Sequence, residues 1–140
     1  MNILLTGGAG YIGSHTAVEL IGRGDEVIIV DDLSNSKIEC LNRVEKITGV
    51  KPKFYQYDVA DKALLTKVFD ENKIDSVVHF AGFKAVGESV AKPLMYYKNN
   101  LNTTLTLLEV MHEHNVNSII FSSSATVYGV PERVPLTEDM

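Results

Sequence analysis

The sequence of 140 residues lacks tryptophan and contains a single cysteine, Cys40. One cysteine excludes an internal disulfide and a cysteine-based metal site, so we expect Cys40 to pack on a helix face. His112 and His114 are two residues apart near the end of a predicted helix and do not share a face, so we expect no metal site there.

Long apolar runs and basic clusters are also missing. No stretch approaches the ~18 consecutive apolar residues of a membrane-spanning helix, and the N-terminus has no signal-peptide pattern. The formal net charge of −5 argues against binding to nucleic acid, which needs a basic surface. We therefore expect one soluble, cytoplasmic domain without a membrane or nucleic-acid partner.

What is present is an alternation of two patterns. Short runs rich in β-branched and aromatic residues are predicted to be strands, at 2–6, 26–30, 53–57, 76–80 and 118–122. Stretches of helical spacing separate them, the longest from Pro93 to Asn115. The alternation predicts an α/β fold with a doubly wound parallel sheet, a Rossmann-like domain over 1–140. Some twenty residues follow the last strand, so we expect this domain to be C-terminally incomplete.

A glycine-rich turn follows the first predicted strand, in "LLTGGAGYIGSH". We expect Gly7 to permit the tight turn, Gly10 to let backbone N–H groups approach a pyrophosphate, and Gly13 to let the helix pack closely. The helix N-terminus adds the positive end of its dipole. The strand–turn–helix context therefore predicts dinucleotide binding.

Acidic residues follow the second and third predicted strands. Asp31 lies eighteen residues after Gly13, where a carboxylate accepts hydrogen bonds from the adenosine ribose and repels a 2′-phosphate. NAD is therefore favoured over NADP, and Asn35 and Ser36 can assist from the same loop. For Asp58 we retain two interpretations, a contact with the adenine edge or a helix N-cap.

The fourth predicted strand ends in "HFAGFKAVGES". The small residues Ala81 and Gly82 leave space for a ligand at the edge of the sheet where ligands bind in such folds. Lys84 offers a cation beside the phosphates, although a surface lysine is the simpler interpretation of that residue alone. We expect His79 to be packed and hydrogen bonded rather than catalytic.

Five motifs together resemble the UDP-glucose 4-epimerase family, extended members of the short-chain dehydrogenase/reductase superfamily. They are "TGGAGYIGSHTAVEL", "DDLSNS", "HFAGFKAVGES", "YYKNN" and "SSSATVYG". The resemblance implies NAD as the cofactor. The residues that it assigns to NAD are Gly7, Gly10, Tyr11, Ile12, Gly13, Asp31, Asn35, Ser36, Asp58, Val59, Phe80, Ala81, Gly82, Lys84 and Asn99.

The resemblance also implies a reaction. UDP-galactose and UDP-glucose are interconverted in galactose metabolism by inversion at C4 through a 4-keto intermediate. Ser124 matches the catalytic serine that hydrogen bonds the 4-oxygen of the sugar, and Lys84 also contacts the substrate. Ser122 and Ser123 are then mainly strand-end residues. The long helix resembles the one through which family members form homodimers, but its apolar residues are equally consistent with core packing.

One part of the family pattern is absent. None of the six tyrosines begins the Y-x-x-x-K motif of the catalytic base, so we expect these 140 residues to bind NAD without turnover. A 4,6-dehydratase is an alternative, but its Asp-Glu pair is replaced by Ala125 and Thr126 after Ser124. A decarboxylase fits "HFAGFKAVGES" poorly. A non-catalytic NAD-binding module remains a further alternative.

Overall fold

The computed structural model describes all 140 residues and contains one five-stranded sheet, in which every pairing is parallel. The strand order is β3-β2-β1-β4-β5. The strands are β1 (Asn2–Thr6), β2 (Glu26–Val30), β3 (Lys53–Tyr55), β4 (Ser76–His79) and β5 (Ile119–Phe121). The helices are α1 (Tyr11–Gly22), α2 (Glu39–Thr48), α3 (Lys62–Glu71), α4 (Val86–Ala91), α5 (Pro93–Glu113) and the 3₁₀ turn η1 (Ala125–Tyr128).

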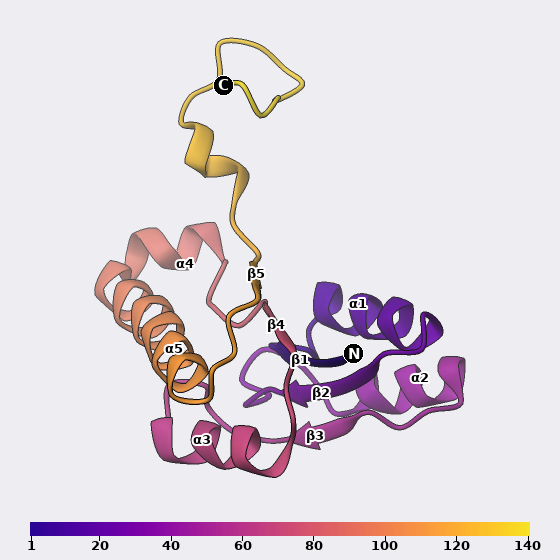
Figure 1. Ribbon diagram of the computed structural model, residues 1–140. Coiled ribbons are helices and arrows are strands. Elements are labelled where there is room, and N and C mark those ends of the chain that lie inside the picture. Colours follow the sequence, from indigo (N-terminus) through magenta and orange to yellow (C-terminus); the bar gives the residue numbers. More distant parts are fainter.

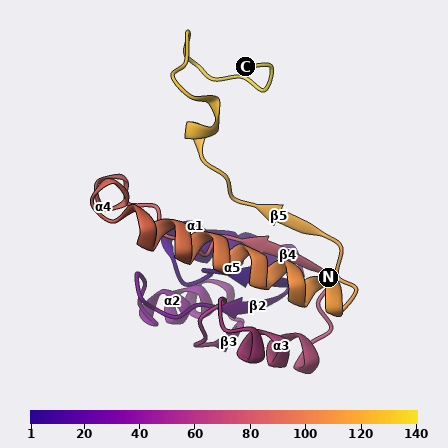
Figure 2. The same cartoon turned by 90° about the vertical axis from the view of Figure 1, so that its left-hand side faces the viewer.

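Helices cover both faces of the sheet, α1 and α2 on one side and α3 and α5 on the other (Figures 1 and 2). Successive residues of β1 point to opposite faces, so Leu4 packs with α3 and α5 while Ile3 and Leu5 pack with α1 and α2. All three are nearly inaccessible to solvent. The predicted doubly wound α/β sheet, with its centre buried on both faces, is confirmed. No helix combines the length and apolar character needed to cross a bilayer.

The strand bounds differ from the prediction mainly at the edges of the sheet. The runs at 53–57 and 118–122 each yield a strand of only three residues. Each of these strands has a neighbour on one side only, so fewer ladder hydrogen bonds extend it. The periodicity of the side chains in the sequence does not indicate which strands lie at the edges of the sheet.

Helix ends follow the local chemistry of the sequence. Asp61 accepts a hydrogen bond from the Leu64 N–H at 3.1 Å and caps α3. Asn115, with φ +57°, lies in the left-handed region just after α5. The short helix α4 was not predicted; it has only six residues, and none of them is buried.

The segment after β5 extends away from the sheet, with η1 and the chain end separate from both layers of helices (Figures 1 and 2). Nearly all residues from 122 to 140 are exposed. Phe121, at the end of β5, is 55% exposed. The packed part of the molecule therefore ends with β5.

Candidate functional site

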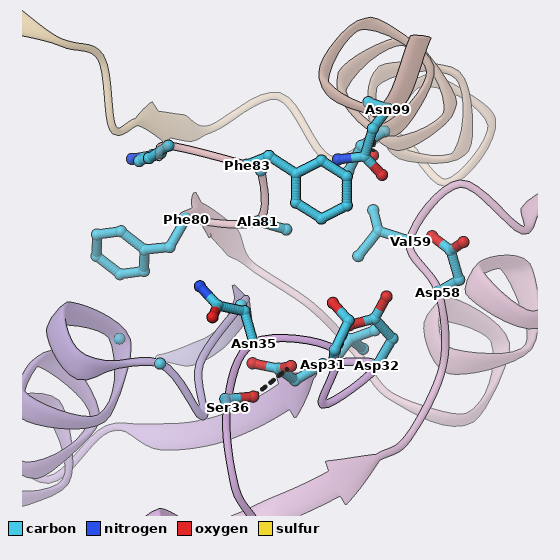
Figure 3. Close-up of a pocket in the computed structure, with 18 of the residues that line it drawn as sticks. Asp31, Asp32, Asn35, Ser36, Asp58, Val59, Phe80, Ala81, Phe83 and Asn99 are labelled. Carbon is cyan, nitrogen blue, oxygen red and sulfur yellow. Dashed lines mark hydrogen bonds between the residues drawn. The ribbon is translucent and has the colours of Figure 1, made fainter. Parts of the chain in front are cut away.

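A cavity of about 440 Å³ lies where the C-terminal ends of β1, β2 and β4 open toward α5. Parallel α/β sheets bind ligands at this edge. The close-up shows side chains from the loops that follow these strands, and from α5, directed into the cavity (Figure 3). All fifteen residues assigned to the cofactor line it: Gly7, Gly10, Tyr11, Ile12, Gly13, Asp31, Asn35, Ser36, Asp58, Val59, Phe80, Ala81, Gly82, Lys84 and Asn99.

In the glycine-rich turn, Gly7 and Gly13 face backbone atoms that leave no space for a side chain. Gly7 has φ +69°, and a Cβ there would lie 2.8 Å from the backbone nitrogen of Ala81. A Cβ on Gly13 would lie 2.5 Å from the carbonyl oxygen of Gly7. Gly10 is the N-cap of α1, and no side chain caps that helix end. The backbone N–H groups of its first turn are therefore open to an anionic ligand.

The carboxylate of Asp31 is held in place by the chain itself. Its Oδ2 accepts a hydrogen bond from the Ala9 N–H at 3.0 Å, and its Oδ1 accepts from the Leu33 N–H at 2.9 Å. Oδ1 also accepts from the Ser36 hydroxyl at 2.9 Å (Figure 3). Three donors fix the side chain, which is 8% exposed. A carboxylate has about four acceptor positions, so it retains capacity to accept from a ribose hydroxyl.

Asp58 does not cap the helix that follows it. The N-cap of α3 is Asp61, and the Oδ1 of Asp58 accepts from the Ala60 N–H at 2.9 Å in the preceding turn. The N-cap interpretation of Asp58 is therefore wrong. Its exposed carboxylate lies at the cavity wall beside the buried Val59 (Figure 3).

A chain of hydrogen bonds behind the cavity fixes the tautomer of His79. The Ala81 N–H donates to Thr6 Oγ1, which lies 2.6 Å from His79 Nδ1; His79 Nε2 lies 3.2 Å from Thr104 Oγ1. The Thr104 hydroxyl donates to the carbonyl oxygen of Asn100 at 2.9 Å, so it must accept the proton of His79 Nε2. The Thr6 hydroxyl then donates to Nδ1, and His79 is neutral.

The environment of His79 disfavours its charged form. Burial, reinforced by the positive charge of Lys84, lowers the pKa of His79 from 6.5 to about 4. His79 is 2% exposed and does not line the cavity. The expectation that it is packed and hydrogen bonded agrees with this placement.

Lys84 lies at the end of the cavity nearest to β5. Its Nζ donates to the Ser122 hydroxyl at 3.2 Å and to the Ser122 carbonyl oxygen at 3.4 Å. Ser124 does not line the cavity; its Oγ lies 2.9 Å from Thr126 Oγ1, and its side chain caps η1. The structure therefore brings Lys84 to the cavity but not Ser124, whose catalytic role stays a prediction.

Sequence reasoning missed several residues at this site. Asp32, Ser34, Tyr57, Phe83 and Thr103 also line the cavity. Asp32 directly follows Asp31, so it too is an acidic residue just after the second strand. Phe83 lies inside the motif "HFAGFKAVGES". No pattern in the sequence distinguishes Thr103. It lines the cavity because it lies on the face of α5 that is turned toward the cavity.

A sequence profile of the GDP-mannose 4,6 dehydratase family matches residues 4–140. The chain belongs to this family. Within the family, it is 60% identical over 139 residues to UDP-glucose 4-epimerase from Bacillus subtilis, covering 99% of this chain and 41% of that relative. It is 58% identical over 139 residues to UDP-glucose 4-epimerase from Haemophilus influenzae, again covering 41% of the relative. The resemblance to epimerases is confirmed along the whole chain.

Solved structures of epimerases agree with these relatives. The crystal structure of UDP-glucose 4-epimerase from Bifidobacterium longum in complex with NAD⁺ and UDP superposes with a TM-score of 0.97 at 59% identity. That comparison covers 99% of this chain and 42% of the Bifidobacterium protein. The chain therefore spans about two fifths of the length of the relatives that it matches.

Proposed function

We propose that this chain forms the NAD-binding part of a UDP-glucose 4-epimerase, which interconverts UDP-galactose and UDP-glucose. The main observation in support is that fifteen residues, separated along the sequence, line one cavity at the ligand-binding edge of the sheet. The epimerase identity of these relatives supports the choice of reaction. The proposal places the protein in the cytoplasm and in galactose metabolism.

The cavity fits a dinucleotide. The uncapped end of α1 and the side-chain-free turn at Gly7 and Gly10 suit the pyrophosphate. Asp31 suits the adenosine ribose, Asp58 and Val59 the adenine, and Lys84 the part nearest to the substrate. When bound, NAD supplies a reversible hydride acceptor at this edge of the sheet.

The residues of this chain bind and orient more than they catalyse. Lys84 contributes a positive charge to the substrate side of the cavity, and Ser124 is the proposed partner of the sugar 4-oxygen. No tyrosine is followed by lysine at the fourth position, so the 140 residues contain no matching base. We therefore expect them to bind the cofactor without converting the sugar.

The dehydratase that gives the family its description is a weaker candidate. Ala125 and Thr126, both in η1, stand where the resemblance places an acid–base pair in dehydratases. The methyl group of alanine cannot transfer a proton, and a threonine hydroxyl is a poor acid at neutral pH. Epimerisation therefore agrees better with these side chains.

We include self-association through α5 in the proposed function. Met111 is buried, as the core-packing interpretation requires. Leu101, Leu105 and Leu108 are 55%, 59% and 42% exposed, respectively, and recur at spacings of four and three along the helix. Such a stripe is typical of a helix that packs against a second helix, and a homodimer would bury it.

Calorimetric titration of the 140-residue chain with NAD tests the proposal, with NADP and UDP-glucose as parallel titrants. We expect NAD to bind and NADP to bind at least about tenfold more weakly, because Asp31 repels a 2′-phosphate. Equal affinity for both dinucleotides would contradict the role of Asp31. A folded sample that binds neither dinucleotide would contradict the proposed site.

A further inference from the structure

We propose that Asn100 is a positioning residue that shapes the wall of the cavity without contacting the ligand. The inference rests on the proposed binding of NAD. Asn100 lies on α5, directly after Asn99, and its side chain faces the turn that follows β4. It is not among the residues that line the cavity.

The side-chain amide of Asn100 holds one residue of that turn at two points. Its Oδ1 accepts a hydrogen bond from the Phe83 N–H at 2.8 Å, and its Nδ2 donates to the Phe83 carbonyl oxygen at 3.0 Å. Both backbone polar groups of Phe83 are therefore satisfied by one side chain. Such a paired contact fixes the orientation of the backbone more strictly than a single hydrogen bond.

Two neighbouring parts of the wall depend on the same amide. Asn99 Nδ2 donates to Asn100 Oδ1 at 3.1 Å, which orients the Asn99 side chain in the cavity wall (Figure 3). Gly82 has φ +156°, and a Cβ there would lie 3.3 Å from the same Oδ1. Asn100 thus holds two lining residues, Phe83 and Asn99, by hydrogen bonds and leaves little room for a side chain at a third, Gly82.

The amide is itself held on a rigid element. Asn100 belongs to the first half of the 21-residue helix α5, and its carbonyl oxygen accepts from Thr104 in the chain that leads to His79. The Phe83 ring also packs on Tyr96 of α5, with ring centroids 5.4 Å apart. The turn after β4 is therefore shaped before any ligand binds, which lowers the ordering cost of binding.

Asparagine is required because the contact needs one acceptor and one donor on the same short side chain. Asn100→Asp keeps the acceptor for the Phe83 N–H but replaces the donor with an oxygen that faces the Phe83 carbonyl oxygen. Asn100→Ala removes both groups. Asn102→Ala is the matched control, since Asn102 is an exposed asparagine of α5.

The test compares two ligands on the wild-type chain and these variants. In the proposed binding mode NAD extends along the cavity as far as Lys84, whereas AMP contains only the adenosine part proposed for Asp31 and Asp58. We expect both Asn100 variants to weaken NAD binding by about tenfold and AMP binding by less than about twofold. Asn102→Ala should leave both affinities unchanged.

Unchanged NAD affinity in both folded Asn100 variants would overturn the inference. Equal weakening of NAD and AMP would also overturn it, because that result indicates a general structural defect. Thermal unfolding of each variant identifies any that fail to fold, and the variant that folds then carries the comparison. If the wild-type chain binds no NAD, the proposed function itself fails. The titration of the wild type alone separates this outcome from a failure of the inference about Asn100.

Discussion

The Thr6 hydroxyl lies 2.6 Å from Nδ1 of His79, its direct partner in the pairing of β1 with β4. This contact joins β1 and β4 at the ends from which the chain enters the cavity wall. Since the Thr6 hydroxyl also accepts from the Ala81 N–H, protonation of His79 at Nδ1 would remove an acceptor that the Thr6 proton needs. The junction is therefore more stable with neutral imidazole than with imidazolium.

The first prediction concerns acid. The pKa of His79 is about 4 in the folded chain and 6.5 when unperturbed, so the unfolded state binds more protons between these values. The contribution of neutral His79 to stability is fully present above about pH 6.5 and is lost as the pH falls toward 4. We expect a loss of roughly 3 kcal/mol in urea unfolding between pH 7 and pH 4.

His79→Gln provides the comparison for that measurement. Glutamine retains a donor and an acceptor but does not titrate in this range. We expect the variant to be less stable than the wild type at pH 7 and to lose less stability on acidification. A variant with the same loss between pH 7 and pH 4 would assign the acid sensitivity to other groups.

The second prediction has the opposite sign. His114 Nδ1 lies 2.8 Å from the Val110 carbonyl oxygen and Nε2 lies 2.8 Å from Asp70 Oδ1, and these contacts raise the pKa of His114, with the Asp70 hydrogen bond as the main cause. The resulting stabilisation is present below about pH 6.5 and is lost as the pH rises through the folded pKa. Asp70→Asn should therefore lower stability more at pH 6 than at pH 9.

We expect the effect of Asp70→Asn to stay below about 1 kcal/mol, because the Asp70 carboxylate is largely exposed. Urea unfolding at the two pH values measures it. Glu45→Gln on the exposed face of α2 is a control that removes a carboxylate without an ion-pair partner. If both substitutions change stability equally at both pH values, the pair has no specific role.

The third prediction separates two glycines of α1. Gly13→Ala would place Cβ 2.5 Å from the Gly7 carbonyl oxygen and 2.7 Å from the Gly8 Cα, so the helix must shift. We expect a loss of about 1–3 kcal/mol in thermal or urea unfolding. Gly22→Ala meets no atom within 4 Å and should stabilise the helix by roughly 0.5–1 kcal/mol. Equal effects at the two positions would contradict the close packing at Gly13.

The fourth prediction tests the exposed stripe of α5. Leu105→Lys should reduce self-association in sedimentation experiments while changing the unfolding free energy of the monomer by less than about 0.5 kcal/mol. Asn102→Lys adds the same charge outside the stripe and should leave association unchanged. Leu107→Ala, at a fully buried position two residues further on, should instead cost about 2–5 kcal/mol of stability. A wild-type chain that stays monomeric at high concentration would contradict self-association.

The sequence predicted those parts of the site that depend on short-range chemistry. The turn at Gly7 needs φ +69°, and Asp31 follows β2 directly, so glycine and aspartate identify these positions without a structure. The role of Asn100 could not be predicted in the same way. Its partner Phe83 is seventeen residues away, and either asparagine of "YYKNN" has the same hydrogen-bonding groups. Only the rotation of α5 against the turn distinguishes Asn99 from Asn100.

The parallel pairing of β1 with β4 also constrains how the molecule folds. Thr6 and His79 are 73 positions apart. Non-local strand pairs of this kind form slowly, because the entropy of closing a long loop is lost before the stabilising contacts form. The backbone of Gly7 meets that of Ala81 only after this closure. Partly folded chains with β1 and β2 already paired therefore lack a complete cavity. A ligand that binds there acts on the folding equilibrium by mass action and selects chains in which the centre of the sheet is closed.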